Sequence, residues 1–205
     1  RGMTLSLYLA LRGRRLTPAE ARTLLQPIME GVALLHKSGL IHRGICPDNI
    51  VLPIDGTARL TGYGTLALRT GGSELKSQLY PGYAAPEQFG RAQTDARTDL
   101  YSLGVTMYEM VTGRLPFEGE NTVSIALAHL EDSLVPPGVH NPEIPASLER
   151  IIMKCMEKKP ERRYANANEV IADLRGALIH PDGDYVQTAV ADKALTGENG
   201  QLNKE

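Results

Sequence analysis

The chain has few cysteines, no long apolar run and little net charge, and each shortage narrows what the protein can be. Two cysteines, Cys46 and Cys155, argue against a disulfide-stabilised scaffold and fit a reducing compartment. No apolar run approaches the roughly 18 to 20 residues that span a bilayer, and no signal peptide is visible. A net charge of −2 gives no reason to expect nucleic acid or an acidic membrane as partner. We therefore expect a cytoplasmic segment without membrane contact.

Length and composition fit one globular domain. The 205 residues are 42% hydrophobic and 22% charged, which is ordinary for a soluble protein with a sizeable core. Residues 179–205 are polar and contain glycine, so we expect a domain over residues 1–178 followed by a disordered tail. The first residue is Arg rather than Met, from which we expect a piece of a longer protein.

Apolar periodicity predicts a mainly helical fold with short strands. Thr17, Pro18 and Glu20 form a strong helix start, and Pro27 should kink the helix that follows. Apolar residues surround the segment 98–112, which predicts a central buried helix. The other expected helices cover residues 4–11, 122–131, 146–157 and 168–178, and the expected strands cover 40–41, 49–52 and 57–61.

Four motifs follow one another in a set order. Residues 42–49 read HRGICPDN, residues 85–87 read APE, residues 99–104 read DLYSLG and residues 159–164 read KPERRY. Their order and spacing resemble the C-terminal lobe of eukaryotic-type serine/threonine protein kinases, in the wording of bacterial members. The resemblance covers residues 2 to 178. It implies a mainly α (α+β) fold, the helical lobe of a protein-kinase-like structure with short β-hairpins.

The resemblance also implies that the N-terminal lobe, with its Gly-rich loop and strand lysine, is absent from this chain. The floor of the cleft, formed by Val51 and the first helix, would then be exposed and could mediate self-association. Val51 is a candidate adenine contact. We predict no bound cofactor, and ATP without magnesium only if that lobe is present elsewhere.

The family's catalytic positions depart from its pattern. The catalytic-loop Asp is Gly44, the Lys two residues on is Cys46, the Asp that opens the D-F-G motif is Gly62, and the docking-segment Thr is Tyr80. Asn49 remains, but one amide is a poor magnesium ligand set. The resemblance with these losses implies a pseudokinase: not an enzyme, without a metal site, and acting as a binding, scaffold or allosteric module in a larger bacterial regulatory protein. Its expected partners are proteins, such as a kinase or its substrate.

The family's structural positions are kept. The resemblance implies that His42 packs on Tyr63, that Asp99 anchors the loop backbone and that Glu87 pairs with Arg163. Arg43 is retained beside them.

Several alternatives stay open. The chain could be a divergent serine/threonine kinase with weak ATP-dependent transfer to protein hydroxyls, using Asp48 as base and Asn49 toward a metal. Arg43 could bind a phosphate on the 65–78 loop, at Thr70, Ser73 or Ser77. Cys46 is either a reactive thiol or a neutral filler, and Cys155 lies on an apolar helix face typical of the core.

Overall fold

The structure, a computed structural model, describes residues 2–13, 15–54, 56–63, 80–90 and 92–187. The helices are α1 (Leu5–Leu11), α2 (Pro18–Lys37), α4 (Ala96–Thr112), α5 (Thr122–Glu131), α6 (Pro137–His140), α7 (Ala146–Cys155) and α8 (Ala167–Ile179). Single turns of 3₁₀ helix are η1 (Pro47–Asn49), η3 (Pro81–Tyr83), η4 (Pro86–Phe89) and η5 (Pro160–Arg162). The prediction of a mainly α fold with a little β-structure is confirmed.

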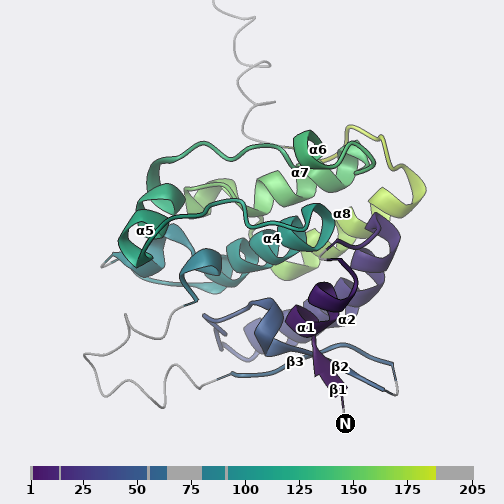
Figure 1. Ribbon diagram of the computed structural model, residues 1–205, viewed down its shortest axis with the longest axis horizontal. Helices are drawn as coiled ribbons and strands as arrows, with labels where there is room; N and C mark the ends of the chain where they lie inside the picture. The colour runs from purple at the N-terminus through teal and green to yellow at the C-terminus, as the bar shows by residue number, and fades with distance from the viewer. Residues whose placement is uncertain (1, 14, 55, 64–79, 91, 188–205) are drawn as a thin grey trace, which may run out of the picture.

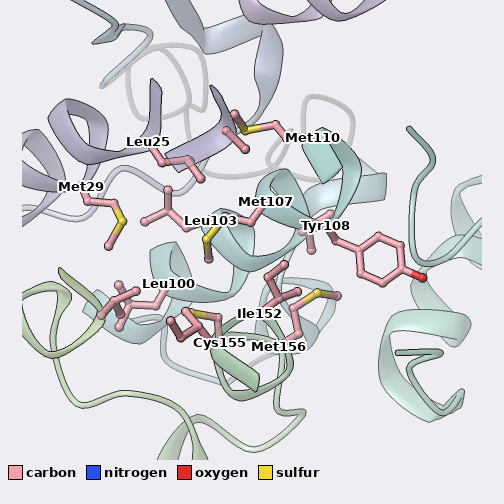
Figure 2. Close-up of a cluster of buried hydrophobic side chains, with 14 of the residues drawn as sticks. Leu25, Met29, Leu100, Leu103, Met107, Tyr108, Met110, Ile152, Cys155 and Met156 are labelled. Carbon is pink, nitrogen blue, oxygen red and sulfur yellow. The ribbon is translucent and has the colours of Figure 1, made fainter. Parts of the chain in front are cut away.

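Helix α4 runs through the centre of the helical layer, as its all-round apolar sequence predicts (Figure 1). Asp95 caps its start by accepting a hydrogen bond from the Arg97 amide at 2.8 Å, and Gly113 ends it at a φ of 79°. Side chains from α2 and α7 close on it from two sides (Figure 2). The buried cluster includes Leu25 and Met29 of α2, Leu100, Leu103, Met107, Tyr108 and Met110 of α4, and Ile152 and Cys155 of α7. Cys155 is therefore core, as predicted.

The start of α2 follows the sequence signal closely. Thr17 Oγ1 accepts from the Glu20 amide at 3.2 Å, and Glu20 Oε2 accepts from the Thr17 amide at 3.0 Å. This reciprocal pair is the capping box expected there. The helix continues past Pro27 to Lys37, and Gly39 turns the chain away with a φ of 73°.

A small antiparallel sheet lies beside α1 and α2, below the layer that contains α4 and α7 (Figure 1). Its order is β1 (Gly2–Thr4), β2 (Ile50–Pro53) and β3 (Arg59–Leu60). Strand β1 was not predicted. A side chain at Gly2 would place its Cβ 2.6 Å from the carbonyl oxygen of Leu52, so glycine permits this close pairing.

The predicted strand at residues 40–41 is wrong. The Leu40 amide donates to the Leu35 carbonyl, which continues the turn at the end of α2. The backbone amides of His42 and Arg43 then bond to a side chain of α4 instead of to a neighbouring strand. The segment is fixed by a helix rather than by a sheet.

The folded region extends beyond the boundary predicted at residue 178. Ser147 donates from both its amide and its hydroxyl to the Pro181 carbonyl, and Val186 is buried. Residues 180–187 therefore pack against α7 and α8, while residues 188–205 lie outside the described ranges. Among the described helices, none combines the length and the apolar character needed to cross a membrane.

Candidate active site

Asp99 fixes the start of the loop at residues 42–49. Its carboxylate, fully buried in the first turn of α4, accepts from the His42 amide at 2.8 Å and the Arg43 amide at 2.7 Å. His36 Nε2 at the end of α2 donates to the same carboxylate at 2.7 Å. A buried carboxylate is tolerated only with such partners. They hold Arg43 at a φ of 63°, the left-handed region, in which it is the only non-glycine among the described residues.

Asn49 closes the other end of the loop. Its Nδ2 donates to the Gly44 carbonyl at 2.7 Å, and the Gly44 amide donates to His42 Nδ1 at 3.2 Å. The Asn49 amide also donates to the Cys46 carbonyl at 3.0 Å. Gly44 is thus part of the loop's hydrogen-bonded frame although it has no side chain to offer a substrate.

Cys46 is a buried thiol. Burial raises its pKa to about 11, because the thiolate would lose its hydration. The surroundings of Cys46 therefore favour a neutral packing role over a reactive thiol. Asp48, two residues on, is exposed.

Gly62 faces Asn49. A Cβ at Gly62 would lie 2.7 Å from Asn49 Oδ1, and the backbone there has a φ of 81°. The following ring, Tyr63, has its centroid 6.3 Å from that of His42, as the predicted packing requires. His42 Nε2 donates to the Thr61 carbonyl at 2.9 Å, and burial lowers the pKa of its imidazole. His42 is thus a neutral packing residue.

Glu87 and Arg163 form the expected buried ion pair. Arg163 Nη1 and Nη2 contact the two carboxylate oxygens at 2.7 and 2.8 Å, and the Thr98 hydroxyl donates to Glu87 Oε1 at 2.8 Å. Burial alone would raise the pKa of Glu87, but the bonds and charge of Arg163 outweigh it and lower the pKa. The pair joins η4 to the start of α4 and to η5.

Tyr80 and Val51 are the other residues that the sequence predicted for the site. Tyr80 is exposed just before η3. Val51 is half-buried on β2 between Thr4 of β1 and Arg59 of β3.

The predicted phosphate acceptors Thr70, Ser73 and Ser77 fall outside the described residues. Arg43 Nε donates to Thr94 Oγ1 at 3.0 Å.

Sequence reasoning missed two residues that hold this loop. Neither His36, which donates to Asp99, nor Gln88, which donates to the Arg43 carbonyl at 3.0 Å, was predicted as a site residue. The available signal for His36 was its position. It is a histidine at the end of a helix, just before a motif rich in unsatisfied backbone amides. Gln88 gave none, because its contact depends on the tertiary path of η4.

The described residues contain no cluster of metal-binding side chains. Within these ranges no three His, Cys, Asp or Glu side chains lie together as metal ligands. Opposite Gly62 the loop offers the amide oxygen of Asn49, whereas magnesium is usually bound through carboxylates.

Comparison with known proteins identifies the family to which this fold and site belong. Residues 2–173 match the family model described as the protein kinase domain. The chain belongs to the protein kinase family. A probable serine/threonine-protein kinase of Clostridium acetobutylicum is 36% identical over 184 residues, which are 86% of this chain and 28% of the relative. The serine/threonine-protein kinase PrkC of Bacillus subtilis is 35% identical over 180 residues, again 86% and 28%. A probable serine/threonine-protein kinase of Clostridium perfringens is 41% identical over 158 residues, 76% of this chain and 23% of that protein.

This membership supports the predicted resemblance to bacterial serine/threonine kinases and overturns one prediction. The expectation that this kinase-family chain is not an enzyme is wrong, because its relatives are named serine/threonine-protein kinases, which are enzymes. Gly44, Cys46 and Gly62 depart from the motif, but they do not establish a loss of activity. The chain also spans only about a quarter of the length of these relatives.

Proposed function

We propose that this chain contains the C-terminal lobe of the catalytic domain of a divergent serine/threonine protein kinase that transfers phosphate from ATP to protein hydroxyl groups. The observation that supports it best is the intact frame of residues 42–49, which Asp99 anchors at one end and Asn49 closes at the other. Phosphoryl transfer depends mostly on positioning, so a frame that holds its backbone in place retains part of the machinery.

The proposed rate is low. Gly44 cannot accept the substrate's hydroxyl proton, and loss of a general base costs roughly 10²- to 10⁴-fold. Asp48 carries an exposed carboxylate in the same loop, and we propose it as the group that accepts this proton. ATP is the phosphate donor in this proposal, with Val51 of β2 at the adenine.

The test is transfer of labelled phosphate from ATP to a protein substrate by the complete polypeptide, with magnesium and with manganese. Slow incorporation is expected above that of a heat-denatured sample. Asn49→Ala should abolish it because the loop opens at Gly44, whereas Leu34→Ser on the exposed side of α2 should not. Incorporation equal to the denatured sample, or unchanged in Asn49→Ala, would contradict the proposal.

We also propose that the domain works in the cytoplasm and binds protein partners as part of a larger bacterial regulatory protein. Exposed leucines on α1, at positions 7 and 11, favour such contacts.

A further inference from the structure

Helix α5 is apolar on its outward face. Val123, Leu127 and Leu130 are 68%, 48% and 46% exposed, and their spacings of four and three place them along one face. The opposite face carries the buried residues Ala128 and His129. The exposed side chains are therefore left over after α5 has packed on the domain.

Exposed carboxylates lie at both ends of this face, and the charge of Lys158 acts on Asp132, the last of them. From Leu115 to Glu149 the sequence has six acidic residues and neither lysine nor arginine. Glu118 and Glu120 lie just before α5, and Glu131 and Asp132 at its end, all of them exposed. In the described ranges, the ion pairs include none of Glu118, Glu120 and Glu131.

Hydrogen bonds fix both ends of α5. Asn121 Oδ1 accepts from the Val123 and Ser124 amides at 3.0 Å, and Lys158 Nζ donates to the Ala128 and His129 carbonyls at 3.1 and 2.6 Å. A face fixed in this way requires little ordering when a partner binds.

We propose that the α5 face, formed by Val123, Leu127 and Leu130 with Glu118, Glu120, Glu131 and Asp132 at its ends, docks a basic amphipathic segment of another protein. The apolar side chains of the partner would cover the three exposed residues, and its lysine or arginine side chains would face the carboxylates. Charge of this sign repels acidic polypeptides and anionic lipid surfaces, so it selects for basic partners. Figure 1 shows α5 at one end of the helical layer, away from α2 and α8.

The test is fluorescence anisotropy of a labelled synthetic helical peptide of Lys, Leu and Ala with one leucine face, titrated with the 205-residue chain. Two matched peptides serve as controls. One has the same composition in scrambled order, and the other has Glu in place of Lys. The apolar variant is Val123→Ser with Leu127→Ser, and the charge variant is Glu118→Gln, Glu120→Gln and Glu131→Gln. Controls are Leu34→Ser, at a position 71% exposed on α2, and Glu161→Gln on η5. Circular dichroism verifies that each variant is folded.

The proposal expects saturable binding of the basic amphipathic peptide, weakened about tenfold or more in the apolar variant because two apolar contacts are lost. It also expects binding that falls with salt in the native chain and less so in the charge variant, with both controls like the native chain. Equal binding of the scrambled or acidic peptide, equal binding by the apolar variant, or no saturable binding would overturn it. The proposal would also be overturned if the native chain sedimented as a dimer and the apolar variant as a monomer, because the face would then bind a second copy of the chain.

Discussion

Gly62 shows how one residue can shape the site through its backbone. Its φ of 81° costs an ordinary residue about 1–2 kcal/mol. A Cβ there would also meet Asn49 Oδ1 at 2.7 Å and displace the side chain that closes the loop on Gly44. Placing a carboxylate at this position is therefore a structural change as well as a chemical one.

We predict that Gly62→Asp lowers the free energy of unfolding by about 1–2 kcal/mol. The matched control is Gly31→Ala inside α2, where the new methyl group would meet nothing within 4 Å and should stabilise by about 0.5–1 kcal/mol. Urea denaturation followed by circular dichroism measures both. A Gly62→Asp chain as stable as the native one would show that residues 61–63 adjust without strain.

At the scale of elements, helix α5 is joined to the rest of the domain through His129. Its ring lies 4.9 Å from that of Phe117 and 5.8 Å from that of Phe89, and its Nδ1 is 2.9 Å from the Tyr101 hydroxyl. Burial, together with the charge of Lys158, lowers the pKa of His129 to about 4. The packing of α5 therefore requires a neutral imidazole.

This requirement predicts a stability that falls with acid. The unfolded chain protonates His129 near its ordinary pKa of about 6.5 and the folded chain only near 4, so the unfolded state binds more protons between these values. Stability should fall by about 2 kcal/mol between pH 7.5 and pH 5 from this group. His42, whose pKa is also lowered, acts in the same direction.

Urea denaturation across this pH range measures the effect. His129→Phe should remove the His129 share of the slope, whereas His180→Gln, an exposed histidine, should retain it. An unchanged slope in His129→Phe would show that His129 does not carry this dependence.

The elements also show which features a sequence can predict. The start of α2 and the extent of α4 were predictable, because capping and apolar periodicity are local signals. Strand β1, the four-residue helix α6 and the absence of a strand at residues 40–41 were not, because each depends on a distant partner. The site divides in the same way. The family motif indicated the Glu87–Arg163 pair, whereas the contacts of His36 and Gln88 required the fold.

At the scale of the whole molecule, exposed apolar side chains occur in two separate regions. The α5 face lies at one end of the helical layer, and α1 with the small sheet lies below that layer, beside the N-terminal residues (Figure 1). Leu7 and Leu11, one turn apart on α1, are at least half exposed, and Met3 on β1 is also exposed. Exposed apolar surface of this kind favours association.

We predict that the 205-residue chain self-associates through α1 and the adjoining sheet. Sedimentation velocity should show a species larger than a monomer whose share grows with concentration, because association follows mass action. Leu7→Ser with Leu11→Ser should shift it to monomer, since these are the exposed large apolar side chains of α1. Leu34→Ser, which removes an equally exposed leucine from α2, should leave the distribution unchanged. A clean monomer of the native chain at high concentration would mean that this surface is too small to hold a second copy.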